Sequence, residues 1–212
     1  VSANSQTVAA GALSAAPSAG FSAQNVIAGN SGVTLGRFVL DATASGEDIR
    51  VTSIQIRGLT GTNADLDDLN SLQLFDGATS LNTGTNVVNP SGNALAADAN
   101  LTFTLDASAL TLSRGTSKVL DLKGNIISTT TPTSNTTYVF DFSAGSPDWG
   151  VTGVSTGQSI SESLATGSAN AVTVVTSGTL TASLDSSSPS EKWYAAGSSG
   201  ITVGIFKFNG TN

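Results

Sequence analysis

Acidic side chains fall in two short bends of the sequence, and carboxylates at this spacing can bind a cation. Glu47 and Asp48 lie in "TASGED", and Asp65, Asp67 and Asp68 lie in "NADLDDLN". Calcium takes about six to eight oxygens from carboxylates, amide carbonyls and the main chain. Calcium is therefore the one cofactor predicted, if both bends meet at one end of the fold. The second bend lacks the spacing and final Glu of an EF-hand, and the alternative is a solvated turn that caps a short helix.

The composition argues against catalysis. The chain contains no His and no Cys, which excludes Ser-His-Asp and Cys-His arrangements and His-ligated zinc sites. The same carboxylates could flank a glycosidic bond, but that mechanism depends on a separation that the sequence does not give. The lysines lie in or beside strand patterns, without a Gly-x-Ser-x-Gly elbow. We therefore predict that the protein is not an enzyme.

Aromatic residues are few, and they allow two interpretations. Trp149, Trp193, Tyr138 and Tyr194 could form the sugar-stacking platform of a carbohydrate-binding module. Alternatively, Tyr138 belongs to an alternating strand, and Trp193 and Tyr194 lie near a repeat junction where packing between domains would bury them.

Charge and hydropathy bear on partners and location. The net charge is −7, and the eight Lys and Arg residues occur singly, so no basic stripe is available for nucleic acid. No apolar run approaches the roughly 20 residues that span a bilayer. Only 11% of residues are charged, while 59 are Ser or Thr. This hydroxyl-rich balance is typical of extracellular β-rich proteins, although without Cys the compartment cannot be inferred from redox chemistry.

The dominant period of the chain is two, as expected for half-buried β-strands. Turn clusters rich in Gly, Asn, Asp and Pro separate these segments. The pattern predicts an all-β, Ig-like antiparallel β-sandwich of about seven to nine strands between Gly32 and Leu184. The alternating segments are 33–41, 49–57, 71–75, 100–106, 116–124, 137–142 and 171–184.

The end of the chain repeats its beginning. Glycines, Thr34 and Phe38 in the segment 32–38 recur at a spacing of 168 residues, in 200–206. At a spacing of 167 residues, Val, Gly, Leu and Ala in 8–15 recur in 175–182. A repeat of this length is the size of one sandwich domain. The predicted organisation is therefore an end strand or linker of a preceding or the same sandwich at 1–31, a sandwich at 32–184, and a junction with the first strand of a second copy at 185–212.

The last segment, "GITVGIFKFNGTN", is predicted to form a strand with apolar groups on both faces. Simple alternation places Ile201, Val203 and Ile205 on one face, and Phe206 and Phe208 on the other. By the repeat, Phe206 takes the core place of Phe38. We expect the junction residues to be buried against another copy in the working assembly; they are Trp193, Tyr194, Ile205, Phe206 and Phe208.

The segment Gly32–Phe142 resembles the Ig-like sandwich repeats of bacterial and archaeal surface-layer proteins and large adhesins, in particular predicted surface proteins of candidate-phylum bacteria. The resemblance rests on strand cadence, the "GED" bend at Gly46–Asp48 and the "LFDG" turn at Leu74–Gly77. It implies a structural or adhesive module displayed in tandem outside the cell, usually without catalysis.

The sequence therefore predicts a structural, self-assembling extracellular protein of a cell-surface layer or filament, whose partners are copies of itself. The alternatives are an adhesive or carbohydrate-binding module that takes surface glycans, and a virion surface protein. Nucleic acid and a membrane span are not expected.

Overall fold

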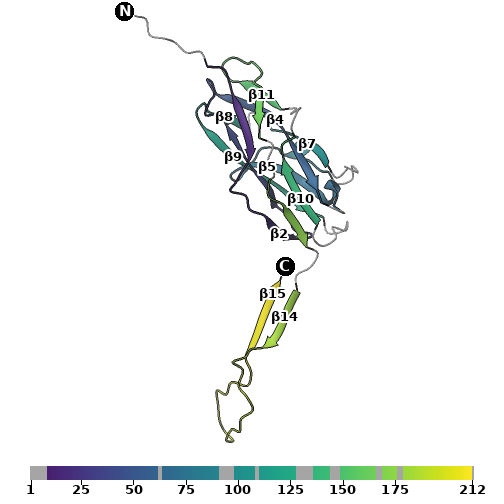
Figure 1. Ribbon diagram of the computed structural model, residues 1–212, viewed down its shortest axis with the longest axis vertical. Coiled ribbons are helices and arrows are strands. Elements are labelled where there is room, and N and C mark those ends of the chain that lie inside the picture. The colour runs from purple at the N-terminus through teal and green to yellow at the C-terminus, as the bar shows by residue number, and fades with distance from the viewer. Residues whose placement is uncertain are drawn as a thin grey trace, which may run out of the picture. The chain divides into compact units, whose positions relative to one another are not determined.

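The computed structural model describes residues 9–61, 64–90, 98–107, 110–127, 136–143, 149–165, 169–175 and 179–211. The chain divides into two compact units, unit 1 from Val1 to Thr176 and unit 2 from Ser177 to Asn212. Figure 1 labels most of the strands, with β14 and β15 in unit 2. Each unit is described by itself.

The first sheet of unit 1 has six strands in the order β12-β1-β3-β9-β5-β6. The edge pair β12–β1 is parallel, and the other neighbours are antiparallel. The strands are β1 (Leu13–Pro17), β3 (Val33–Asp41), β5 (Leu69–Asp76), β6 (Thr79–Ser80), β9 (Ser117–Ile126) and β12 (Glu162–Leu164).

The second sheet has the order β11-β4-β10-β13-β2, and β7 and β8 also pair with β4. The long β4 therefore organises this sheet, while β13 and β2 form a parallel pair at its edge. The strands are β2 (Gln24–Ile27), β4 (Ile49–Thr60), β7 (Asp98–Thr104), β8 (Leu110–Leu112), β10 (Thr136–Asp141), β11 (Gly150–Gly153) and β13 (Val172–Val175).

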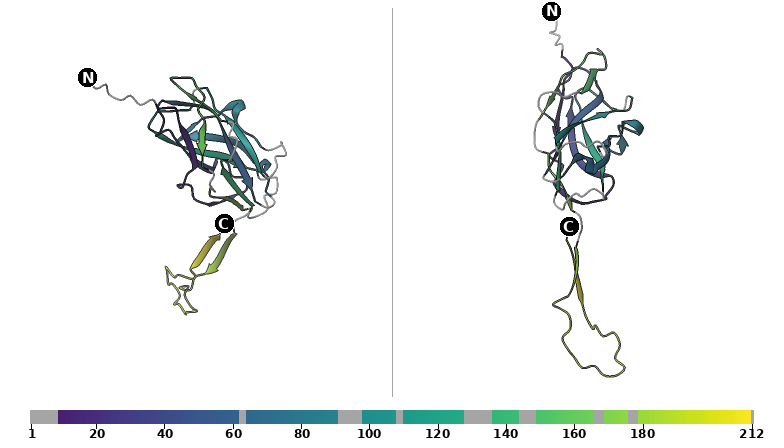
Figure 2. Two further views of the ribbon diagram at one scale, coloured as in Figure 1. Left: turned by 45° about the horizontal axis from the view of Figure 1, so that its top comes forward. Right: turned by 90° about the vertical axis from the view of Figure 1, so that its right-hand side faces the viewer.

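The core of unit 1 lies between the two sheets, which Figure 2 shows from two further sides. Alternation places one set of side chains from each strand inside, because successive residues of a strand point to opposite faces. Phe38 of β3 is 1% exposed and lies 4.9 Å, centroid to centroid, from Phe142, just beyond β10. The sheet register shifts between Thr34 and Gly36 of β3, and both Leu35 and Phe38 are buried. Two-sheet burial of this kind confirms the predicted all-β sandwich.

Helical structure in the described part of the chain is limited to two 3-10 turns. The first, η1 (Leu66–Asp68), follows β4, and Asp65 caps it in a capping box with Asp68. The second is η2 (Gly84–Asn86). No helix among the described residues has the length and apolar character needed to cross a membrane.

Unit 2 contains one antiparallel ladder, formed by β14 (Thr179–Leu184) and β15 (Phe206–Thr211). Residues 185–205 connect the two strands without regular structure. The ladder pairs six residues of each strand, from Thr179 opposite Thr211 to Leu184 opposite Phe206.

Unit 1 is larger than the sandwich expected from the sequence, and it ends earlier. Strands β1 and β2, within 1–31, pair with β3 and β13 of this same sandwich. At the other end, unit 1 stops at Thr176, and the expected last strand, 171–184, is divided between β13 and β14. Unit 1 also contains more strands than expected, because short edge strands such as β6, β8 and β12 show little alternation.

Candidate functional site

The β14–β15 hairpin of unit 2 has one apolar face and one polar face. Residues opposite each other in an antiparallel ladder share a face, so the register fixes both sets. The polar face carries Thr181, Ser183, Lys207 and Asn209. The apolar face carries Leu180, Ala182, Leu184, Phe206 and Phe208. Leu180 is 73% exposed, and Phe206 and Phe208 are each 64% exposed.

The ladder of this hairpin repeats the ladder between β1 and β3 of unit 1. A spacing of 167 residues carries β1 onto β14, and a spacing of 168 carries β3 onto β15. Four successive pairs then coincide. In unit 1 they are Ser14–Asp41, Ala15–Leu40, Ala16–Val39 and Pro17–Phe38, and in unit 2 they are Thr181–Asn209, Ala182–Phe208, Ser183–Lys207 and Leu184–Phe206.

Hydrogen bonds directly after the first strand also repeat. The amide of Ser18 donates to the carbonyl of Arg37 over 2.8 Å, and the amide of Asp185 donates to the carbonyl of Ile205 over 2.8 Å. A second bond closes a turn three residues later in each unit. These bonds run from Phe21 N to Ser18 O and from Ser188 N to Asp185 O.

The turn before β3 has a counterpart before β15. Gly29 and Gly197 have φ angles of 88° and 91°, and Gly32 and Gly200 have φ angles of 67° and 72°. Glycine is favoured at each of these positions because other residues rarely adopt a positive φ. Together with the ladder, the turns identify residues 179–211 as a structural repeat of the β1–β3 segment.

The counterpart residues differ in burial. Phe38 and Leu40 are 1% and 0% exposed in unit 1, whereas their counterparts Phe206 and Phe208 are each 64% exposed in unit 2. The first unit covers this face with its second sheet. In the described part of unit 2, β14 and β15 pair only with each other.

The expected faces of the terminal segment are wrong. Residues 201–205 are not part of a strand, and β15 begins at Phe206. The apolar alternation changes phase between Ile205 and Phe206, and a single regular strand cannot place both sets inside. Unit 1 shifts its register at the corresponding place, between Thr34 and Gly36.

All five predicted junction residues are exposed in this single chain. Trp193 is 98% exposed, Tyr194 52% and Ile205 39%. By the repeat, Trp193 corresponds to the exposed Asn25 and Tyr194 to the buried Val26 of β2. Burial of Phe206, Phe208 and Tyr194 in an assembly stays a prediction, whereas the repeat gives no support for burial of Trp193.

The two acidic bends lie at opposite ends of β4. Glu47 and Asp48 directly precede this twelve-residue strand, and Asp65, Asp67 and Asp68 follow it. At about 3.3 Å per residue, the strand separates the bends by roughly 40 Å. Among the described residues, no three carboxylates come together where they could hold a metal ion. Asn63, which belongs to the second bend, lies outside the described residues. The condition set for a shared calcium site is therefore not met.

Glu47 binds a loop of its own sandwich. Its Oε2 accepts hydrogen bonds from the amides of Ser155 and Thr156 over 2.9 and 3.0 Å, and its Oε1 accepts one from the Thr156 hydroxyl over 2.8 Å. These donors, above all the hydroxyl, lower the pKa of Glu47. Asp48 accepts a hydrogen bond from the amide of Arg114 over 2.9 Å. Both carboxylates thus hold loops together.

Asp68 is buried and serves the core. The Tyr138 hydroxyl donates to its Oδ2 over 2.7 Å, and the amide of Asp65 donates to the same oxygen over 3.3 Å. Burial, followed by this contact with Asp68, raises the pKa of Tyr138. Asp65 and Asp67 flank the start of η1, as the alternative interpretation of a capped turn expected.

The four aromatic residues do not form one sugar-binding platform. Tyr138 is 0% exposed. Trp149 packs its ring against the edge of Phe142 at 5.4 Å, and its Nε1 donates to the carbonyl of Gln55 over 3.1 Å. Trp193 and Tyr194 belong to unit 2. A platform made from all four is excluded because Tyr138 is in the core.

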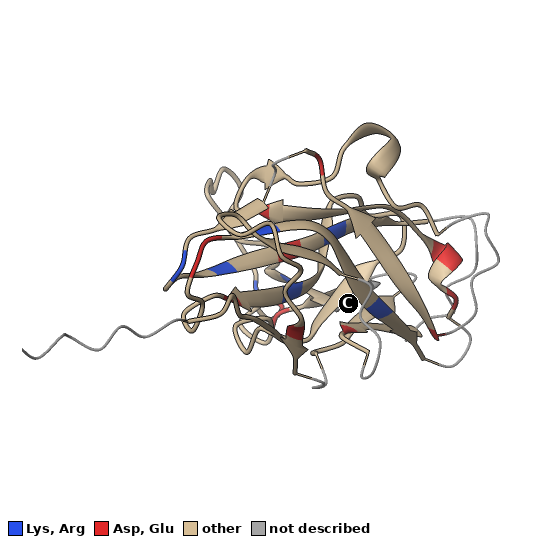
Figure 3. Ribbon diagram, turned by 90° about the horizontal axis from the view of Figure 1, so that it is seen from above, with Lys and Arg blue, Asp and Glu red and all other residues tan. Residues whose placement is uncertain are grey.

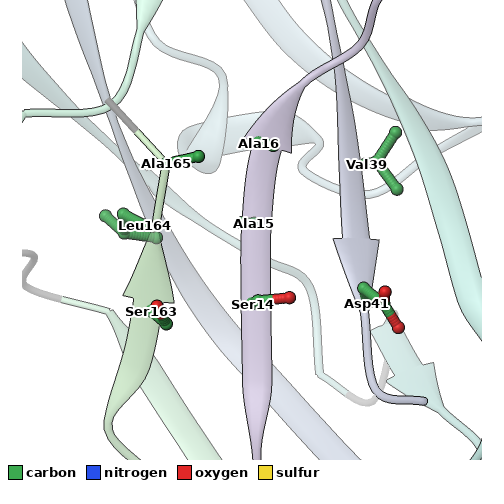
Figure 4. A pocket seen from close by; sticks show the side chains of 8 residues that line it. All are labelled: Ser14, Ala15, Ala16, Val39, Asp41, Ser163, Leu164 and Ala165. Atoms are coloured by element: carbon green, nitrogen blue, oxygen red, sulfur yellow. The ribbon is translucent and has the colours of Figure 1, made fainter. Parts of the chain in front are cut away.

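A shallow groove on the outer face of the first sheet was not anticipated. Its volume is about 250 Å³. Figure 4 shows β1 along its middle, between β12 and β3. The groove is lined by Ser14, Ala15, Ala16, Val39, Asp41, Ser163, Leu164 and Ala165. Small residues at the centre of a strand leave a depression, but nothing in the local sequence distinguishes this depression from ordinary packing.

Charged side chains are spread singly over the fold, as Figure 3 shows. Two bidentate ion pairs cross neighbouring strands: Arg37 with Asp121, and Arg57 with Asp141. Each carboxylate raises the pKa of its arginine. Neither pair was predicted, because the partners lie far apart in the sequence.

The comparisons with known proteins give little beyond this geometry. No family model matches the chain, and no curated protein matches it. Among solved structures, a crystal structure of ACE19, the collagen-binding subdomain of the Enterococcus faecalis surface protein ACE, aligns with 81% of this chain and 99% of that chain. The identity is 12% and the TM-score 0.20, too low to carry an argument. The class of protein is therefore defined by its own fold, a β-sandwich followed by a hairpin that repeats part of it.

Proposed function

We propose that this chain is a non-catalytic structural module of a self-assembling extracellular array, built from tandem β-sandwich repeats on a cell surface. The observation that supports the proposal is the β14–β15 ladder, which reproduces the β1–β3 register pair for pair. Stacked repeats that share such segments form extended, quasi-one-dimensional proteins. The hydroxyl-rich, weakly charged composition suits an extracellular surface.

Electron microscopy of the producing cells, labelled with antibodies against unit 1, tests this function. We expect the label on the cell surface with a regular repeat. The variant Phe206→Asp should lose the regular repeat while unit 1 stays folded, because it places a charge on the apolar face. Thr181→Asp is the matched control, since it places the same charge on the polar face of the same ladder. Label inside the cell, or an unchanged array in Phe206→Asp, would contradict the proposal.

The alternative function is an adhesive or glycan-binding module, and the groove along β1 is the feature that favours it. A ligand in that groove would lie over Ala16 and between Val39 and Leu164. Binding of surface glycans to the purified chain, abolished by Ala16→Trp, would support this alternative over a purely structural role.

A further inference from the structure

We propose that the apolar face of the β14–β15 hairpin is the docking surface for a second copy of residues 45–175, the strands β4 to β13 of another repeat. This inference rests on the proposed repeat array and names the partner of its junction. In the complete junction, a β9-type strand pairs with β15 and a β12-type strand pairs with β14. A sheet of the β4–β10 type covers the phenylalanines.

The strand partners follow from the edges that the repeat leaves open. In unit 1, the second edge of β3 pairs with β9, with Phe38 opposite Leu120, and the second edge of β1 pairs in parallel with β12. The corresponding edges of β15 and β14 have no partner in the described part of unit 2. Unpaired strand edges expose donors and acceptors that accept a further strand.

A glycine shows that the covering sheet also fits. At Gly36 an added Cβ would lie 3.2 Å from the Phe38 ring and 3.5 Å from the Cβ of Phe140, in the opposite sheet. The repeat keeps glycine at this place, as Gly204. In the single hairpin, an added Cβ at Gly204 would meet the Phe206 ring only at 3.6 Å, an ordinary contact. The hairpin alone does not require this glycine, but a covering sheet does.

Other occupants fit less well. Two hairpins packed face to face would offer five apolar side chains each, whereas a stable interface takes about 20–30 residues a side. Exchange of the hairpin into a complete unit 1 would expose β1 and β3 in turn, so the buried apolar area would not grow. A copy that lacks its own β1–β3 segment gains that area in full.

One residue in the repeat provides a test at the level of a single contact. In unit 1, Arg37 Nε lies 2.6 Å from Asp121 Oδ1 and Nη2 lies 3.1 Å from Oδ2. The counterpart of Arg37 in unit 2 is Ile205. An Asp121 brought by a second copy would therefore face Ile205 without a partner, and Ile205→Arg should restore the pair.

The direct experiment extends the full chain beyond Asn212 with a second copy of its own residues 45–176, which continues the 168-residue register. Hydrogen exchange followed by mass spectrometry should show the amides of 206–211 protected in the extended chain and nearly unprotected in the original chain. Ile205→Arg should slow that exchange a further two- to fivefold or so in the extended chain, and should change nothing in the original. Phe206→Asp should remove the protection and leave unit 1 protected.

A graft keeps the inference testable if the extended chain aggregates. Residues 12–44 of unit 1 are replaced by residues 179–212, which carry the same ladder. The grafted unit should unfold cooperatively in urea, and Ile205→Arg within it should raise the midpoint. Equal exchange of 206–211 in the original and extended chains, or a graft without a cooperative transition, overturns the inference. A graft that folds alongside a chain that is absent from the cell surface would refute only the proposed function.

Discussion

Phe206 lies opposite Leu184 in the β14–β15 ladder, at the place that Phe38 holds opposite Pro17 in the β1–β3 ladder. The two phenylalanines share a register and differ in environment, since Phe38 is 1% exposed and Phe206 is 64% exposed. Local pairing is therefore set by the repeated segment, while burial depends on strands that unit 1 has and the described part of unit 2 lacks.

Truncation should separate the two environments. We expect Phe38→Ala to lower the free energy of unfolding of unit 1 by about 3–5 kcal/mol, because it removes a buried ring and leaves a cavity. Phe206→Ala should change it by less than about 0.5 kcal/mol in the same chain, since the ring is exposed. Urea unfolding followed by circular dichroism measures both. A large effect of Phe206→Ala on unit 1 would show that the hairpin already packs against it.

The sandwich was predictable because its long strands alternate cleanly. β3, β4 and β9 each bury every second residue over most of their length, and this period is visible in the sequence. The repeat could be found in the same way, because glycines with positive φ at Gly29 and Gly32 return at the same spacing as the strands.

The site was harder to predict, because it depends on contacts between distant segments. The calcium hypothesis required two bends to meet, and only the fold shows that β4 separates them. The faces of the terminal strand failed for a local reason: a phase change after Ile205 looks like alternation until the strand boundary is known. Asp68 resembles a surface carboxylate in sequence, yet it is buried against Tyr138.

The two arginine pairs should differ in their contribution to stability. Arg57→Met leaves the Asp141 side chain, which is 6% exposed, without its bidentate partner. A buried charge that loses its partner costs about 3–5 kcal/mol. Arg37→Met should cost less than about 1 kcal/mol, because the side chains of Arg37 and Asp121 are 38% and 18% exposed. Similar losses in the two variants, measured by urea unfolding at low and high salt, would refute this ranking.

Calcium removal tests the acidic bends. With the bends at opposite ends of β4, we expect the melting temperature to be the same in EDTA and in millimolar calcium. A ligand bound only by the folded state would raise it by mass action. If calcium does raise the melting temperature, Asp67→Asn and Asp48→Asn will show which bend binds it, and the calcium prediction from the sequence stands for that bend alone.

Glu47 should make unit 1 sensitive to acid. Its pKa is lowered from 4.5, first by the Thr156 hydroxyl and then by the amides of Thr156 and Ser155, against an opposing effect of burial. A carboxylate with a lowered pKa binds its proton less readily in the folded than in the unfolded state. Its contribution is therefore fully present above pH 4.5, and it is lost as the pH falls through the folded pKa. Thr156→Val removes the main cause of the shift, and Glu47→Gln removes the titrating group. We expect the unfolding midpoint in urea to fall less steeply below pH 4.5 in both variants than in the unaltered chain. Asp106→Asn is the matched control at another carboxylate with a lowered pKa, held by Thr83 and Asn86, and it should leave the Glu47 contribution in place. If Glu47→Gln follows the same acid profile as the unaltered chain, the hydrogen bonds to the 155–156 loop do not stabilise the folded state.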